Sequence, residues 1–141
     1  MLHVVGVGPD RERLEDQARS AGVAERVIFY GWKPDAWVEA AMRGCDLFLL
    51  ASSQEGMPTV LLESLRLGAP TLVSDLPGNR AIADAVAWPA IFPLGDLAAL
   101  SKAMLDWAGR PIPAAVPQRI EALFSWDVLA PRMMRVYRAD R

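Results

Sequence analysis

Short hydrophobic runs alternate with amphipathic segments along most of the chain. The runs rich in Val, Ile, Leu and Phe lie at residues 2–7, 26–30, 46–50, 69–74 and 87–93. Between them, apolar side chains recur at helical spacing over residues 10–21, 34–43, 59–67 and 80–85. Continuously apolar strands are typical of parallel sheets that are covered on both faces. The pattern therefore predicts an α/β fold, a Rossmann-like doubly wound parallel sheet of about five strands with flanking helices.

The C-terminal part of the chain is helical in pattern, with one interruption. Asp96 stands at the N-cap position of a helix that we expect to end near residue 108. Prolines and glycines interrupt the periodicity over residues 109–117, which we interpret as a break between two helices rather than between two domains. Ser125 is expected to cap the final helix. The side chains that this helix places at core spacing are Leu129, Met133, Val136 and Tyr137.

Composition and charge narrow the class of protein. With 141 residues, of which 52% are hydrophobic and 23% charged, the chain has the size and apolar content of one globular domain, residues 1–141. Fifteen Lys and Arg against 17 Asp and Glu give a net charge of −2, which argues against a nucleic-acid partner. Cys45 is the single cysteine and His3 the single histidine. The sequence thus predicts neither a disulfide nor a zinc site, and we expect His3 to be structural, in a buried strand.

Membrane segments are not predicted. The first residues lack the pattern of a signal peptide, and no apolar run approaches the ~18 residues that span a bilayer, so we expect a soluble, cytoplasmic protein. Arg132, Arg135 and Arg138 lie three apart in the final helix and are expected to form a solvated face. The alternative is a weak peripheral contact with anionic lipid at the inner face of the membrane. Core or interface positions are expected for Trp32, Trp37, Trp88, Trp107 and Trp126.

The first candidate motif is a glycine turn after the first strand. Gly6-Val7-Gly8-Pro9 partly matches the dinucleotide fingerprint G-x-G-x-x-G, but Arg11 occupies the third glycine position. Because helix and strand must pack closely at that position, a bound nicotinamide or flavin dinucleotide is disfavoured. Two interpretations remain: a plain tight turn, or a loop near a ligand, since all loops at the carboxyl ends of such strands face one crevice.

The second motif is a pair of glutamates that flank the start of a helix. Glu55 precedes Pro58, and Pro58 fits the first turn of a helix that runs to Leu67. The free N–H groups of Thr59 and Val60, together with the helix dipole, form a site suited to a phosphate. Glu63 lies one turn further on the same face, about 6 Å along the axis, where a carboxylate can hold two ribose hydroxyls. Glu55 would lie on the other side of the phosphate, so the arrangement suits a sugar nucleotide.

A structural interpretation of the same segment is also open. Glu55 could simply complement the positive helix N-terminus, and Glu63 could pair with Arg66 on a solvated face. In that case Gly56 serves only the turn.

Taken with the preceding Ser52-Ser53 and the following Ala69-Pro70, the stretch from Glu55 to Glu63 resembles the E-x7-E signature of family 4 retaining glycosyltransferases, which have the GT-B fold. Further similar segments cover nearly the whole chain. They are residues 2–9, 27–32 and 46–52, similar to strands of the family's nucleotide-binding domain, and 124–126, similar to the start of its closing helix.

The resemblance assigns roles to individual residues. Glu55, the candidate catalytic residue, would bind a hydroxyl of the donor sugar, and Glu63 would bind the donor ribose. The remaining candidate substrate-binding residues form two groups. The backbone after Glu55 would bind sugar and diphosphate, which involves Gly56, Met57, Thr59 and Val60. The base would meet the backbone of Gly31 and Trp32, with Gly8 at the same edge of the sheet.

The sequence also departs from the family pattern. The family's first strand and helix, with an Arg and a Lys that clamp the diphosphate, have no counterpart among these residues, nor does the N-terminal acceptor domain. We therefore expect the truncated C-terminal half of such an enzyme, or one subunit of a split enzyme that needs a separate acceptor subunit. The absent strand would lie between residues 2–7 and 46–50. Either those two strands pair directly, or a partner fills the gap.

The predicted function is that of the donor-binding domain of a retaining glycosyltransferase, which takes a nucleoside-diphosphate sugar and transfers the sugar to an acceptor. The alternative is a non-catalytic nucleotide-sugar binding subunit. A nicotinamide dehydrogenase ranks third because of Arg11. No Asp-x-Asp motif is present, so we expect no metal and no cofactor besides the donor substrate.

Overall fold

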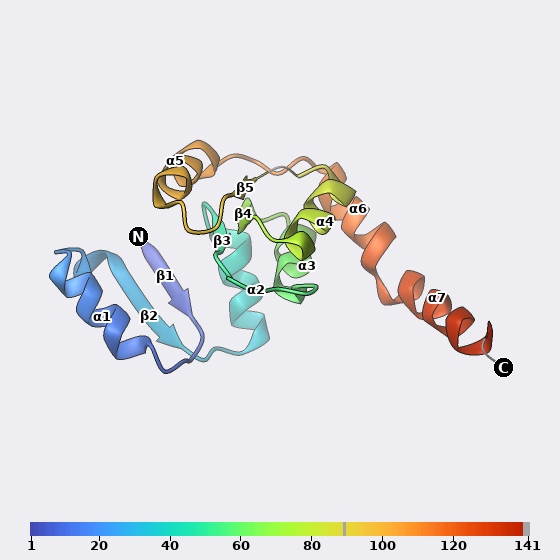
Figure 1. The fold of residues 1–141 in the computed structure, drawn as a ribbon, viewed down its shortest axis with the longest axis horizontal. Helices are drawn as coiled ribbons and strands as arrows, with labels where there is room; N and C mark the ends of the chain where they lie inside the picture. Colours follow the sequence, from blue (N-terminus) through green and yellow to red (C-terminus); the bar gives the residue numbers. More distant parts are fainter. Residues whose placement is uncertain (89, 140–141) are drawn as a thin grey trace. The chain divides into compact units, whose positions relative to one another are not determined.

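The computed structural model describes residues 1–88 and 90–139. Its chain divides into two compact units, Met1–Ala41 and Met42–Arg141 (Figure 1). Both units are built from parallel strands and helices that alternate along the chain. This confirms the predicted α/β class.

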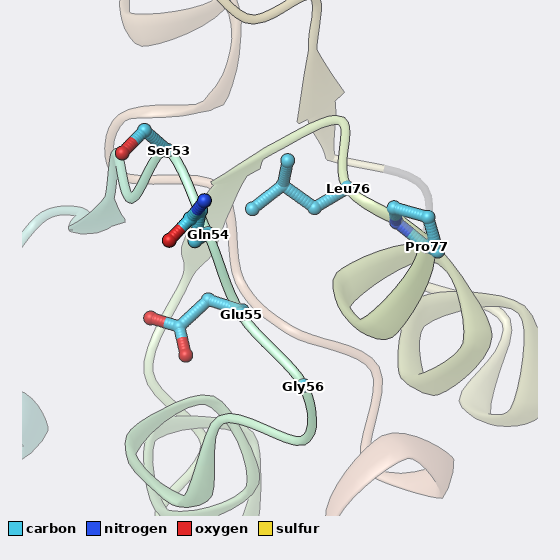
Figure 2. A pocket seen from close by; sticks show the side chains of 6 residues that line it. All are labelled: Ser53, Gln54, Glu55, Gly56, Leu76 and Pro77. Carbon is cyan, nitrogen blue, oxygen red and sulfur yellow. The ribbon is translucent and has the colours of Figure 1, made fainter.

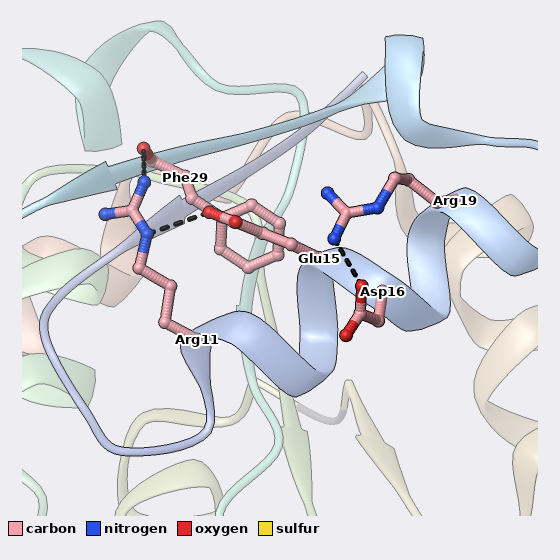
Figure 3. A network of polar contacts seen from close by, with 5 residues as sticks. All are labelled: Arg11, Glu15, Asp16, Arg19 and Phe29. Carbon is pink, nitrogen blue, oxygen red and sulfur yellow. Dashed lines mark hydrogen bonds and ion pairs between the residues drawn. The ribbon is translucent and has the colours of Figure 1, made fainter.

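The first unit contains a two-stranded parallel sheet. Its strands are β1 (Leu2–Val5) and β2 (Val27–Gly31), and they are joined through α1 (Arg11–Ser20) and a short 3-10 helix, Ala24–Arg26. Arg11 reaches from the start of α1 to β2, where its Nη2 donates to the Phe29 carbonyl at 3.2 Å (Figure 3). The same guanidinium donates from Nε to Glu15 at 2.8 Å. Arg11, which occupies the third glycine position of the dinucleotide fingerprint, therefore links α1 to β2 through its side chain.

The second unit contains a three-stranded parallel sheet in the order β3-β4-β5. Its strands are β3 (Phe48–Leu50), β4 (Thr71–Ser74) and β5 (Ile91–Phe92). Its helices are α3 (Thr59–Arg66), α4 (Pro77–Val86), α5 (Leu97–Trp107), α6 (Ala115–Phe124) and α7 (Trp126–Ala139). The helix α2 (Asp35–Gly44) follows β2 and includes the boundary between the units.

The core of the second unit lies around the central strand. All four residues of β4 are buried, as expected for a strand with a neighbour on each side. Trp88 is 5% exposed, and its Nε1 donates to the Thr71 carbonyl at 2.6 Å. Its ring meets that of Trp107 edge-on, with centroids 5.0 Å apart. The largest fully buried apolar side chains are Leu61, Leu65, Leu72, Ile82, Val86 and Val116.

The five strands form two hydrogen-bonded sheets instead of one. Among the described residues, β1 pairs with β2 alone, and β3 pairs with β4 alone. Direct pairing of the strands near residues 2–7 and 46–50, which lie in different units, stays a prediction. A further strand supplied by a partner remains a prediction. Having one neighbouring strand, β1 is also largely exposed, so the expectation that His3 lies in a buried strand is wrong. Its Nδ1 lies 3.1 Å from the Tyr30 hydroxyl.

Two helices differ from the sequence prediction. Residues 109–117 were expected to interrupt the helical pattern, but α6 begins within this stretch, at Ala115, and buries Val116 and Ile120. Pro117 is tolerated because it falls in the first helical turn, where N–H groups have no intrahelical partner. Similarly, α4 begins at Pro77 rather than near Arg80. Proline at the first position of a helix is favourable for the same reason.

The last helix does not bury the side chains that its spacing predicted. Met133, Val136 and Tyr137 of α7 are 48%, 65% and 67% exposed, which corrects their expected core position, while Leu129 is half-buried. Trp32 and Trp126, at 71% and 74% exposed, are not core residues, so an interface position stays the prediction for these two tryptophans. Helical periodicity identifies an apolar face, but the burial of that face depends on a partner element.

Other expectations have simpler outcomes. The Asp96 cap is confirmed, because its Oδ1 accepts from the Ala99 N–H at 2.8 Å. The last predicted strand, residues 87–93, is reduced to β5 at the sheet edge, and its Pro89 lies outside the described residues. Over residues 1–88 and 90–139, no helix is both long and apolar enough to cross a membrane.

Candidate functional site

The candidate site lies where β3 leads through a loop into α3. Pro58 is buried in an extended conformation, with φ −73° and ψ 109°, and its carbonyl accepts from the N–H groups of Leu61 and Leu62. Thr59 and Val60 are the first two residues of α3, so their N–H groups have no carbonyl of a preceding helical turn to pair with. These donors and the positive end of the helix dipole point toward the loop side. The geometry is that of an anion-binding helix N-terminus.

A pocket of about 450 Å³ lies beside this loop (Figure 2). One wall is formed by four consecutive residues after β3, namely Ser53, Gln54, Glu55 and Gly56. The other wall is formed by Leu76 and Pro77, which follow β4. In Figure 2 the side chain of Leu76 points toward the loop, whereas the carboxylate of Glu55 points away from Leu76 and Pro77. Two loops at the carboxyl ends of neighbouring parallel strands thus enclose the pocket, as is usual in this fold class.

The second wall of the pocket was missed at the sequence level. Leu76 and Pro77 line the pocket, but they lie between the predicted strand at 69–74 and the predicted helix at 80–85, where no functional residue was expected. The signal that could have found them is their position directly after a buried strand, because parallel neighbours end at the same edge of the sheet.

Asp75, directly after β4, forms an ion pair with Arg80. Its carboxylate accepts from Arg80 in a two-pronged arrangement, at 3.0 Å from Nε and 2.5 Å from Nη2. The hydrogen bonds and charge of Asp75 raise the pKa of Arg80 above its usual value. Arg80 therefore neutralises the negative charge of Asp75. The carboxylate that lines the pocket is that of Glu55.

The remaining predicted residues fall into two groups. Met57, Thr59, Val60 and Glu63 continue from the pocket wall along the loop and the exposed side of α3. The others, Gly8, Gly31 and Trp32, belong to the first unit. There Gly31 ends β2 at φ +68°, a left-handed conformation that favours glycine, and its carbonyl accepts from the Gly6 N–H at 2.9 Å.

Metal-ligating groups do not cluster in the part of the chain that the structure describes. No group of three or more His, Cys, Asp or Glu side chains that could hold an ion occurs over residues 1–88 and 90–139.

Comparison with known proteins decides the family. The model of the family "Glycosyl transferases group 1" matches residues 1–111. The chain belongs to this family. The resemblance that Glu55, Glu63 and their surroundings indicated is thereby confirmed at the level of the family.

Individual relatives cover different shares of this glycosyltransferase-family chain. The lipopolysaccharide 1,6-galactosyltransferase of Salmonella typhimurium is 38% identical over 76 residues, which cover 52% of this chain and 21% of that protein. The phosphatidyl-myo-inositol mannosyltransferase of Mycobacterium leprae is 33% identical over an aligned length of 142 residues, gaps included. The alignment covers 96% of this chain and 37% of that protein. The chain therefore spans well under half the length of these curated relatives.

Solved structures agree in fold. A sucrose-phosphate synthase from Thermosynechococcus elongatus is similar with a TM-score of 0.84 and 24% identity, over 98% of this chain and 38% of that one. The apo form of the lipopolysaccharide outer core galactosyltransferase WaaB is similar with a TM-score of 0.76 and 25% identity, over 99% of this chain and 41% of that one. The predicted Rossmann-like α/β fold is thus confirmed.

Proposed function

We propose that this chain is the donor-binding domain of a retaining glycosyltransferase, which transfers a sugar from a nucleoside-diphosphate sugar to an acceptor. The observation that carries the proposal is the pocket at Glu55 and Gly56, next to the free N–H groups at the start of α3 and one turn before Glu63. The family and the galactosyl- and mannosyltransferase names of its relatives support the class of reaction.

In this proposal the residues act on successive parts of the donor. Thr59 and Val60 donate to the diphosphate, and the dipole of α3 stabilises the negative charge that develops there when the bond to the sugar breaks. Glu63 accepts from two ribose hydroxyls. Glu55 accepts from a sugar hydroxyl and orients the ring, while the backbone of Gly56 and Met57 contacts sugar and diphosphate. A fixed set of donors needs no reorganisation as the diphosphate leaves, which lowers the barrier.

The rest of the donor and the acceptor require further surfaces. We assign the base to the backbone of Gly31 and Trp32, because Gly31 ends β2 in a left-handed conformation and Trp32, 71% exposed, follows it directly. Gly8 follows β1, which runs parallel to β2, and is assigned to the same edge of that sheet. The acceptor would be held by an N-terminal acceptor domain or a separate acceptor subunit. No cofactor besides the donor is invoked.

Replacing Gly56 by alanine tests the backbone role of the loop. A Cβ built at Gly56 meets nothing within 4 Å, and the residue has no left-handed φ, so we expect stability to change by less than about 0.5 kcal/mol. If the N–H groups after Glu55 approach a diphosphate, the added methyl group hinders that approach. We expect about fivefold weaker binding of uridine or guanosine diphosphate, equal to roughly 1 kcal/mol. Titration followed by amide chemical shifts measures it.

Gly44→Ala is the matched control for this substitution. Gly44 ends α2, has no left-handed φ, and an added Cβ there also meets nothing within 4 Å. It should leave diphosphate affinity unchanged. Equal affinity of Gly56→Ala and the unaltered chain would count against a backbone contact at the loop.

For cellular location, we propose the cytoplasm, at the inner face of the membrane. Arg132, Arg135 and Arg138 are all exposed on α7, which supports a weak attraction to anionic lipid. We expect the chain to sediment in part with phosphatidylserine vesicles at low ionic strength and to be released by salt. Changing the three arginines to glutamine should abolish sedimentation, whereas Arg19→Gln in α1 should not. Salt-independent binding, or none, would refute the lipid contact.

A further inference from the structure

The first turn of α4 lies in direct backbone contact with the pocket loop. A Cβ built on Gly78 would lie 2.1 Å from the Gly56 carbonyl oxygen and 3.2 Å from the Glu55 carbonyl oxygen. Gly78 has no left-handed φ, so its conformation is open to any residue. Glycine is required at position 78 because the loop backbone occupies the space of a side chain. This contact fixes the distance between the two walls of the pocket.

Hydrogen bonds also join α4 to the pocket loop, through the end of β4. The Ser74 hydroxyl, at the end of β4, donates to the Ser52 carbonyl in the loop at 2.7 Å. Asn79, in α4, donates from Nδ2 to the Ser74 carbonyl at 2.8 Å, and the same Nδ2 lies 3.4 Å from the Ser74 hydroxyl. Ser74 and Asn79 have no exposed surface. The chain Asn79-Ser74-Ser52 therefore ties α4 through β4 to the loop that carries Glu55.

This arrangement carries a cost in stability. Among the described residues, Asn79 Oδ1 is buried without a hydrogen-bond partner. An unsatisfied buried polar atom costs about 1–3 kcal/mol, and an apolar side chain of similar shape would avoid that cost. The Ser74 carbonyl would remain paired in that case, because it also accepts from the Leu76 N–H at 2.9 Å. Stability of the fold alone therefore does not account for an asparagine at this position.

We propose that Gly78, Ser74 and Asn79 are positioning residues that hold the Glu55–Gly56 loop in register with α4 and thereby set the sugar side of the donor pocket. The inference rests on the proposed function of Glu55. Because the Gly56 carbonyl would have to retreat by about 1 Å to admit a Cβ at position 78, these residues act on the sugar contact through the loop. Glu63 and its ribose contact lie one turn into α3 and are not displaced by the same shift.

Gly78→Ala tests the role through the ratio of two affinities. Amide-shift titrations would measure the affinities of uridine and guanosine diphosphates and of the two nucleotide sugars, uridine diphosphate galactose and guanosine diphosphate mannose. Each ligand is titrated into the unaltered chain and into each variant. We expect Gly78→Ala to bind the diphosphate about fivefold more weakly and the diphosphate sugar at least about twenty-fivefold more weakly, because the displaced Gly56 backbone contacts both ligands whereas Glu55 contacts the sugar alone. Gly44→Ala, whose Cβ meets nothing within 4 Å, should change neither value. A general loss of stability would lower the affinities for the diphosphate and for the diphosphate sugar by the same factor.

Asn79→Leu provides a second variant that does not crowd the loop. It removes the hydrogen bond to Ser74 and the unpaired oxygen, so the unfolding temperature should be retained or raised. Amide hydrogen exchange at Glu55 and Gly56 should nevertheless become faster, with a loss of sugar affinity of about threefold. Ser64→Ala is its control, because the Ser64 hydroxyl is equally buried but donates to Leu61 within α3.

The outcomes separate the two levels of the proposal. If the unaltered chain binds diphosphate sugars and Gly78→Ala and Asn79→Leu bind them with the same affinity, the positioning role is wrong and the proposed function stands. If the unaltered chain binds none of these nucleotides, the proposed function is wrong, and the positioning role falls with it. Equal factors of loss in the affinities for the diphosphate and for the diphosphate sugar would also overturn the positioning role.

Discussion

The 141-residue chain by itself should transfer no sugar at a measurable rate, although it should bind a nucleoside diphosphate weakly. Transfer requires an acceptor held at reactive distance from the donor carbon with water excluded, and such orientation supplies about 7–11 kcal/mol of the barrier. The chain corresponds to 41% of the solved galactosyltransferase WaaB, so we expect the acceptor surface elsewhere. Binding should survive because Thr59, Val60 and Glu63 are present, at about millimolar affinity, or roughly 4 kcal/mol.

This expectation can be checked with the purified chain. Radiolabelled diphosphate sugars report transfer, and amide shifts during titration with uridine and guanosine diphosphates report binding. Shifts should appear near Gly31, Gly56 and Thr59 and be absent near residues 132–138. Sugar transfer by the chain alone, or shifts confined to residues 6–11, would show that the site is wrongly assigned.

Replacing Glu63 by glutamine should weaken nucleoside diphosphate binding about tenfold or more. A carboxylate that accepts from two ribose hydroxyls contributes about 1.5–3 kcal/mol through each hydrogen bond, because the acceptor is charged. Glutamine keeps the size of the side chain and removes the charge. Since Glu63 is exposed on α3, the free energy of unfolding should change by less than about 0.5 kcal/mol. The comparison is a titration followed by amide shifts, with a thermal unfolding curve for each variant.

Glu121→Gln is the matched control for this prediction. Glu121 is an exposed glutamate on α6 and does not line the pocket. Its substitution should leave diphosphate affinity unchanged. An unchanged affinity of Glu63→Gln would instead favour the structural interpretation, in which Glu63 serves a solvated helix face with Arg66.

The elements predicted well are those with local causes. The helix from Thr59 follows from Pro58 at its start and apolar spacing within eight residues, and the helix from Leu97 follows from the Asp96 cap. The loop wall of the pocket followed from the same segment, because Glu55 and Gly56 directly precede α3. Local geometry at a helix start depends on a few adjacent residues, which a sequence displays completely.

Elements that depend on distant partners were predicted less well. The helix α6 was missed because its prolines read locally as a break, whereas burial of Val116 and Ile120 stabilises the helix against α3 and α4. The apolar residues of α7 had core spacing but remain exposed. In α6, packing against α3 and α4 outweighs the local signal of a break, whereas in α7 the apolar side chains stay exposed because their burial depends on a partner element.

The sequence by itself determined the α/β class, the order of the strands and helices around the site, the family, and the start of α3 between two glutamates. These properties follow from periodicity and from short segments. Only the tertiary structure decided that Leu76 and Pro77 close the pocket, that Gly78 lies against the Gly56 carbonyl, and that Ser74 and Asn79 join α4 to the loop. The contacts of Gly78 with Gly56 and of Ser74 with Ser52 each connect residues 22 positions apart, and their distances depend on how β3, β4 and α4 pack, which no local pattern specifies.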